Sequence, residues 1–337
     1  MTAYRFLQPL DVLFLRGNKL FGDPGSFGES LVPPWPSAAA GALRSRMLAD
    51  EGVDPAAFAT GDVRHSTLGT PAEPGPFRVT AFHVARVTPA GEIELLAEPP
   101  ADLILSRDDK GALNLAALAP SPLPAGLASS APLPLLPVLG EPQRRKPAAG
   151  YWLSQQGWAA YLQGRLPAAA DLVSTGELWQ VDARVGVGLD PEQRRADDGK
   201  LFTPQAVAFR PESGFLIGVA GAEPPVAGAV RLGGDGRAAA VRPAACELPM
   251  PDLAAIASAG RCRVVLTSPG IFPNGWRPPG SEPDGRFALG GVRGRLVSAA
   301  VPRAQIVSGL APTDRVVAKP SREITDGMRV EVLEAEP

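Results

Sequence analysis

Proline density between residues 116 and 150 is the feature that most limits how this chain can fold. Eight of these 35 residues are prolines, and residues 131–137 read APLPLLP. Each proline fixes φ and removes a backbone donor, so such a run is excluded from helices and from the interior of a sheet. We therefore expect residues 116–150 to form an irregular insertion or connection. This predicts an N-terminal domain at residues 1–115 and a C-terminal domain at residues 151–337.

The rest of the composition indicates a chain that buries a core and stays in water. Of the 337 residues, 45% are hydrophobic, and the formal net charge is −2. No apolar run is long enough to span a bilayer, and residues 1–10 lack the apolar block of a signal peptide. Cys246 and Cys262 alone can form neither a disulfide framework nor a four-ligand metal site. We expect a soluble cytoplasmic protein with no membrane contact, cofactor or metal.

Charge is distributed unevenly along the chain, and arginine dominates it. Of the 33 cationic residues 28 are arginine, and residues 261–322 contain ten basic residues against three acidic ones. Arginine suits bidentate phosphate contacts and stacking on bases, which favours a nucleic-acid partner. Codon bias in a GC-rich gene is the alternative explanation of the arginine excess. The small net charge by itself argues against a nucleic-acid binder.

Hydrophobic periodicity predicts an α+β fold. We expect helices at residues 37–48, 151–164 and 251–259, the first of them capped by Pro36 or Ser37. Single helices separating runs of strands in two halves favour tandem ferredoxin-like (βαββαβ, RRM-like) units with long Gly/Pro-rich insertions. Strands are expected at residues 3–15, 77–87, 92–96, 101–106, 179–189, 201–220, 228–242, 263–267 and 292–308.

Catalytic patterns are largely missing from the sequence. Its two histidines, His65 and His83, lie in no motif that supplies a nucleophile or a positioning partner. The pairs at 108–109 and 197–198 are aspartates in polar, Gly-containing segments, which are typical of solvated turns. No phosphate-binding GxxxxGK[ST] motif occurs. The glycines of residues 232–237 (LGGDGR) would let backbone N–H groups approach a phosphate, although an ordinary hairpin turn explains them equally well.

Four segments together resemble one protein family. They are residues 7–22 with 33–44 (including PPWPS and GALR), residues 184–202 (RVGVGLD…RR…DGKLF), the LGGDGR turn, and residues 308–310 with 319–320. In order and spacing they are similar to the Cmr-type repeat-associated mysterious proteins (RAMPs), and in particular to the third subunit of the type III-B (Cmr) CRISPR effector complex. Leu310 stands where the family has an aromatic residue, and Asp235 replaces a glutamate.

The resemblance implies a non-catalytic subunit with tandem ferredoxin-like domains, acting in antiviral defence. It would hold the 5′ repeat-derived handle of the CRISPR RNA and dock on the large polymerase-like subunit and on a backbone RAMP subunit. A RAMP-fold endoribonuclease that uses His65 as a base, or a purely structural module, remain the alternatives. The RNA-binding residues that the resemblance and the residue chemistry indicate are Arg16, Lys19, Phe21, Ser37, Arg44, Arg184, Arg194, Arg195, Gly233, Gly234, Arg237 and Lys319.

Overall fold

The computed structural model divides the chain into two units, Met1–Val301 and Pro302–Pro337. All described residues belong to the first unit, so Lys319 and the other residues after 301 lie outside them. Among the described helices, none is long and apolar enough to cross a membrane. The described residues are 2–16, 27–123, 125–126, 133–141, 145–190, 192–193, 195–268, 270, 272, 277–289 and 292–301.

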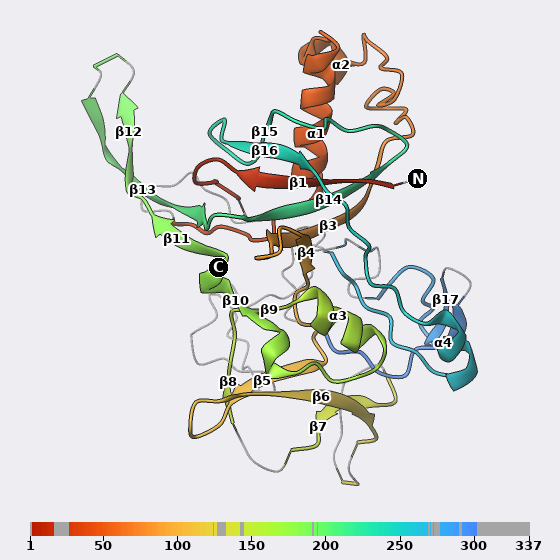
Figure 1. Ribbon diagram of the computed structural model, residues 1–337. Helices are drawn as coiled ribbons and strands as arrows, with labels where there is room; N and C mark the ends of the chain where they lie inside the picture. Colours follow the sequence, from red (N-terminus) through yellow and green to blue (C-terminus); the bar gives the residue numbers. More distant parts are fainter. Residues whose placement is uncertain are drawn as a thin grey trace, which may run out of the picture. The chain divides into compact units, whose positions relative to one another are not determined.

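A six-stranded antiparallel sheet forms the centre of this unit (Figure 1). Its middle strand, β14, pairs along one edge with β1 and along the other with β3. Seven of the eight β14 residues are buried, so the strand is covered on both faces. The strands, in spatial order, are β15 (Ala229–Arg231), β16 (Ala238–Pro243), β1 (Thr2–Pro9), β14 (Ser213–Ala220), β3 (Arg78–Val87) and β4 (Ile93–Leu96).

Alternation along these strands supplies two separate hydrophobic cores. Successive side chains of a strand point to opposite faces. Leu7 and its register partner Phe215 therefore belong to one core, whereas their neighbours Phe6 and Leu216 belong to the other. All four side chains are fully buried. The sheet is thus the shared wall of both cores, and each face needs its own cover.

Helix α1 (Pro36–Asp50) covers the first face, with α2 (Pro55–Thr60) beside it. Alanines and leucines favour the helix, and Pro36 occupies a first-turn position where no backbone donor is needed. The expectation that Pro36 or Ser37 caps this helix is wrong. Trp35 is the N-cap, it makes no side-chain cap, and Ser37 lies exposed in the first turn.

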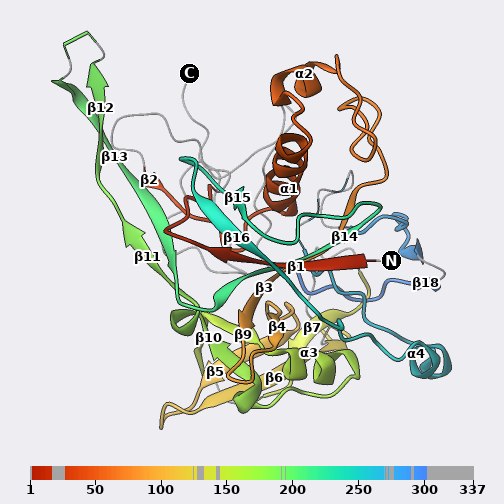
Figure 2. The ribbon, with the colours of Figure 1, turned by 45° about the horizontal axis from the view of Figure 1, so that its top comes forward.

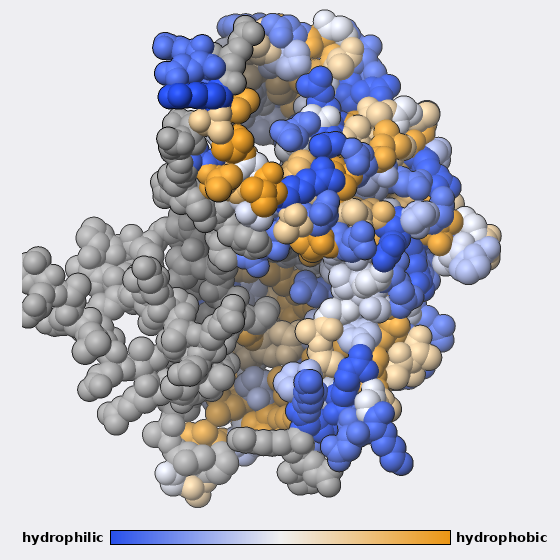
Figure 3. All heavy atoms as spheres, turned by 90° about the vertical axis from the view of Figure 1, so that its left-hand side faces the viewer, coloured by the Kyte–Doolittle hydropathy of each residue, from blue (hydrophilic) through white to orange (hydrophobic). Residues whose placement is uncertain are grey.

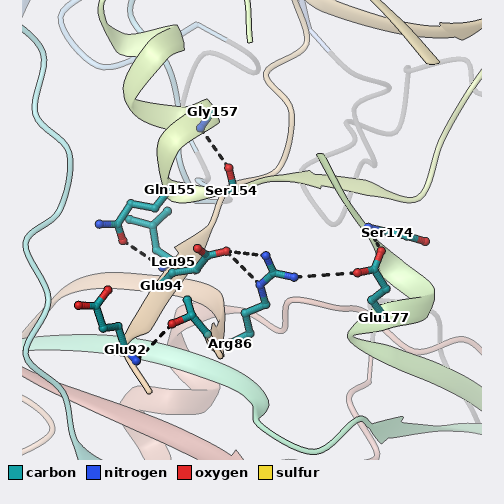
Figure 4. A network of polar contacts seen from close by, with 10 residues as sticks. Arg86, Glu92, Glu94, Leu95, Ser154, Gln155, Gly157, Ser174 and Glu177 are labelled. Carbon is teal, nitrogen blue, oxygen red and sulfur yellow. Dashed lines mark hydrogen bonds and ion pairs between the residues drawn. The ribbon is translucent and has the colours of Figure 1, made fainter. Parts of the chain in front are cut away.

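The second face is covered by a smaller layer of helix and strands. Arg86 of β3 connects the two layers: it pairs with Glu94 of β4 at 2.9 Å and reaches Glu177 at 4.0 Å (Figure 4). Gln155 accepts a hydrogen bond from the Leu95 N–H at 3.3 Å beside it. The layer comprises β9 (Tyr151–Leu153), α3 (Gln155–Leu162), β10 (Leu172–Ser174) and two 3₁₀ turns, η1 (Ala169–Asp171) and η2 (Thr175–Glu177).

The expectation that residues 116–150 lack regular structure is wrong for much of the segment. Strand β6 runs across residue 115 and pairs with β5 and β7. Prolines are tolerated because they sit at strand ends and edges, where Pro120 faces Pro137 and few donors are required. The four-stranded sheet that results contains β5 (Leu103–Arg107), β6 (Leu113–Ser121), β7 (Leu136–Leu139) and β8 (Lys146–Pro147).

The tandem ferredoxin-like arrangement is not confirmed, although the mixture of helix and strand is. The central sheet takes β1 and β3 from the first predicted half of the chain and β14 and β16 from the second. Residues 151–153 begin as strand β9 rather than as helix, and residues 263–267 form no strand. The predicted boundaries near residues 115 and 150 stay a prediction. The remaining elements are α4 (Leu253–Ala259), β17 (Arg286–Leu289) and β18 (Val292–Arg295).

A two-stranded arm extends beyond the central sheet (Figures 1 and 2). Its long strand β13 (Arg195–Phe209) pairs with β11 (Trp179–Ala183) near the sheet and with β12 (Gly186–Asp190) further out. The short strand β2 (Phe27–Gly28) pairs with β13 at Thr203 and Pro204. The predicted strand at residues 201–220 is therefore two strands, β13 and β14, which belong to different sheets.

Replacing Leu7 by alanine should destabilise the unit by about 2–5 kcal/mol, because a fully buried leucine would leave a cavity beside Phe215. The matched control is Leu10→Ala, at a leucine three residues further on that is 63% exposed. The control should change the free energy of unfolding by no more than about 0.5 kcal/mol. Urea unfolding followed by circular dichroism measures both variants. Equal losses for the two would contradict this sheet register.

Candidate nucleic-acid interface

Residues 10–16, which we call the connector, leave the end of β1 and tie three parts of the chain together. Leu13 and Val207 of β13 exchange backbone hydrogen bonds of 2.9 and 2.8 Å. The Phe14 carbonyl accepts a hydrogen bond from the Gly234 N–H at 2.8 Å. Arg16 forms a backbone bridge with Ser30. The connector therefore joins the arm, the segment around Ser30 and the β15–β16 turn.

The turn at residues 232–237 uses its glycines to approach the connector. Gly233 has a φ of +82°, and a Cβ at this position would lie 2.7 Å from the Phe14 carbonyl oxygen. Gly234 already donates its N–H to that oxygen. Only Gly236, at which a Cβ would meet nothing within 4 Å, faces open space. The close backbone approach expected from the sequence is thus made to the protein's own chain.

Arg237 is partly neutralised where it lies. Its guanidinium forms an ion pair with Asp11 and stands 5.5 Å from the centre of the Phe14 ring. An ion pair of this kind reduces the positive charge offered to a phosphate. Sequence reasoning missed the pairing because Asp11 and Arg237 are 226 positions apart.

Arg16 and Arg184 lie on opposite sides of the inner part of β13. On one side, the Ser30 hydroxyl donates to the Gln205 carbonyl at 2.6 Å, next to the bridge of Ser30 with Arg16. On the other side, the Arg184 N–H donates to the Pro204 carbonyl at 3.0 Å. Arg184 also contacts Asp182 at 2.9 Å, whereas no carboxylate pairs with Arg16 among the described residues. Arg16 is the less neutralised of the two cations.

One face of the arm is apolar and exposed. Val187 stands opposite Leu201 in the register, and they are 38% and 57% exposed. Val185 and Leu189, two positions to either side of Val187, are 74% and 66% exposed, and the pairing register with β13 shifts between Val187 and Leu189. Figure 3 views this side of the molecule, where apolar residues lie close to strongly hydrophilic ones. Alternation in RVGVGLD predicted a strand correctly, but alternation cannot tell a buried face from one that awaits a partner.

The other predicted RNA-binding residues divide into three groups. Arg195 begins β13 on the outer arm and is exposed. Ser37 and Arg44 line a hollow with Arg78, which lies in register with Ala220 and so at the far end of the sheet from the connector. Lys19, Phe21, Arg194 and Lys319 lie outside the described residues. The basic run 261–322 is described only in part, and within it Arg263 and Arg286 form ion pairs.

The two histidines, His65 and His83, lie in different surroundings. The His65 Nδ1 atom accepts the N–H groups of Thr67 and Leu68 at 3.0 and 3.1 Å, which requires an unprotonated Nδ1. Its Nε2 lies 3.1 Å from a Glu51 carboxylate oxygen, and the imidazole is buried. Burial lowers the pKa of His83. Within the described ranges, no cluster of three or more metal-ligating side chains occurs.

Comparison with known proteins gives one family and several distant structures. The model of the family described as CRISPR-associated protein (Cas_Cmr3) matches residues 5–325. No curated protein is significantly similar to the chain. A chain of the type III-B Cmr-beta structure bound to cognate target RNA and AMPPnP is similar with a TM-score of 0.37 and 14% identity. A second, bound to cognate target RNA, has a TM-score of 0.35 and 14% identity.

Each structural match covers 72% of this chain and 64% of the other, so the chain spans less than two thirds of the chains that it matches. The family match, in contrast, runs over nearly the whole sequence. It confirms the resemblance carried by the motifs at residues 7–44 and 184–202 and by the LGGDGR turn. This chain belongs to the family of CRISPR-associated proteins described as Cas_Cmr3.

Proposed function

We propose that this subunit holds the 5′ repeat-derived handle of the CRISPR RNA and does not cut RNA. The observation that carries the proposal is the convergence of three family-like segments on the connector. The Gly234 N–H bond to the Phe14 carbonyl joins residues 232–237 to residues 7–16, and Leu13 bonds Val207 of β13, the strand that contains the end of the segment 184–202. Single-stranded RNA is bound through such composite surfaces, with cations on phosphates and splayed bases stacked on side chains.

Arg16 is the described cation best suited to contact phosphates, and Arg184, although it is paired with Asp182, is the second candidate on the other side of β13. They flank β13, and their guanidinium groups can form bidentate, charge-assisted hydrogen bonds. Arg237 takes a supporting role, because its ion pair with Asp11 and its position over Phe14 hold the turn against the connector. Lys19, Phe21 and Arg194 remain part of the proposal on the grounds of the sequence motifs alone.

The apolar face of the arm is proposed as a docking surface for a backbone subunit of the effector. Four exposed valine and leucine side chains on one protruding hairpin cost free energy in water. A partner that covers them recovers this free energy, and the edge of β12 that pairs with no described strand can add main-chain hydrogen bonds. The large polymerase-like subunit is the second proposed partner, with no described surface assigned to it.

Replacing Arg16 or Arg184 by alanine should weaken binding of handle RNA to the assembled complex by about 1–2 kcal/mol per contact. The slope of log affinity against log salt should decrease by about 0.7 for each lost phosphate contact to a single strand. The matched control is Arg165→Ala, at an exposed arginine that bonds only Gln163. Fluorescence anisotropy at several salt concentrations provides both quantities. If the affinity for handle RNA and its salt dependence are unchanged in both variants, binding of the handle at this surface is refuted.

Lysine at both Val187 and Leu189 should abolish co-elution of the purified subunit with the backbone subunit in size-exclusion chromatography. The reason is that two charges would have to be buried on the apolar face of the arm. Leu166→Lys is the control, because Leu166 is 53% exposed but lies away from the arm. All variants should keep the wild-type circular dichroism spectrum. Normal co-elution of the double variant would exclude the arm as the docking surface.

Repeat-containing RNA should stay intact when it is incubated with excess subunit, with or without Mg²⁺. His65→Ala should instead destabilise the fold by about 1–3 kcal/mol, because two buried N–H donors would lose their acceptor. Gel electrophoresis of end-labelled RNA and thermal unfolding measure the two effects. Specific cleavage by the wild type that is lost in a still-folded His65→Ala variant would establish the endoribonuclease alternative.

A further inference from the structure

Two adjoining hollows lie where α1 and β3 begin, and Pro36 and Val79 line both of them. The first has a volume of about 380 Å³, and the second has a volume of about 280 Å³. Pockets of this size accept small organic ligands when polar groups converge on them. Because the hollows share a wall, one ligand with two chemically different parts can occupy both.

The first hollow carries positive charge that the protein itself does not neutralise. Arg44 stands 5.1 Å from the centre of the Phe77 ring, which leaves the edge of the guanidinium free to donate. Arg78 donates to the Phe77 carbonyl at 2.7 Å. In the part of the chain that the structure describes, neither arginine has a carboxylate partner, and the nearby Glu73 pairs with Arg64 instead. With the exposed Ser37 hydroxyl beside them, these cations suit an anion such as a phosphate.

The second hollow combines apolar walls with side chains that can form hydrogen bonds to the polar edge of a ligand. Trp158, Leu162 and Leu248 line it together with His83. Since burial lowers the pKa of His83, the neutral ring offers one donor and one acceptor. Hydroxyl groups from Thr80, Thr267 and Ser268 line the same hollow. Apolar walls and convergent hydrogen-bonding groups are what a nucleobase requires.

We propose that the two hollows together bind one nucleotide, with its phosphate at Arg44 and Arg78 and its base beside His83 and Trp158. The site is separate from the connector: Arg78 lies in register with Ala220 and Ala220 with Thr2, so the site adjoins the start of β1 rather than its end. The nucleotide can be free, or it can be one unit of an RNA strand. The proposal does not depend on whether the connector binds the 5′ handle of the CRISPR RNA.

The test uses the purified full chain with three probes: adenosine 5′-monophosphate, adenosine, and the pentanucleotide A5. The double variant Arg44→Gln/Arg78→Gln should weaken binding of the two phosphate-bearing probes at least tenfold and leave adenosine unaffected. His83→Ala should weaken adenosine binding at least threefold. Arg165→Gln, an exposed arginine outside both hollows, should change none of these affinities. Calorimetry measures the first two probes, and anisotropy of a labelled strand measures A5.

If the monophosphate and A5 bind with similar affinity, the site is supported and a free nucleotide is a sufficient ligand. If A5 alone binds, the site is supported and its nucleotide comes from an RNA strand. No binding of either probe would overturn the proposal. Wild-type affinity of the Arg44→Gln/Arg78→Gln variant for the phosphate-bearing probes would also overturn it. An equal loss of affinity in Arg165→Gln would do the same, because it would indicate non-specific electrostatic attraction. Circular dichroism melting confirms that each variant is folded.

Discussion

Strand β14 is the element on which the rest of the unit depends. It is buried on both faces and hydrogen-bonded along both edges, to β1 and to β3. A shift in the register of this strand would cost more buried apolar contacts than a shift in any other strand. A slip by one residue would move the side chains of each core to the opposite face of the sheet. Phe215 and Leu216 fix the register because each fills a different core. The pairing with β1 in turn fixes where the connector begins, and therefore where the candidate interface lies.

Local patterns in the sequence predicted much of the fold. The helix at residues 36–50 and the strands around residues 77–87 and 228–242 follow directly from composition and alternation. Proline misled the prediction for residues 116–150, because its local effect on the backbone is severe but harmless at a strand edge. Whether Pro120 lies at an edge or in the interior of a sheet depends on its pairing with Pro137. This pairing cannot be predicted from the sequence around Pro120 alone.

The candidate interface shows the same division between local and distant information. Glycines and arginines in the family-like segments could be read from the sequence. The charge that these residues present could not be read, because it depends on partners far along the chain. Asp11 neutralises Arg237 while no described carboxylate does so for Arg16, and only the folded chain distinguishes these two arginines. His65 likewise became a structural residue only when the acceptor role of its Nδ1 was visible.

The long sequence separation between β1 and its partners has a consequence for synthesis. On the ribosome, residues 2–9 emerge long before their two neighbours in the sheet, β14 and β16, which end at residues 220 and 243. More than two hundred residues must therefore emerge before this strand can acquire either partner. Until then its apolar side chains Phe6 and Leu7 stay without a core, in a segment whose edges can pair with other nascent chains. Strand β1 is thus made long before it can take its place in the sheet, and its apolar side chains need protection in the meantime.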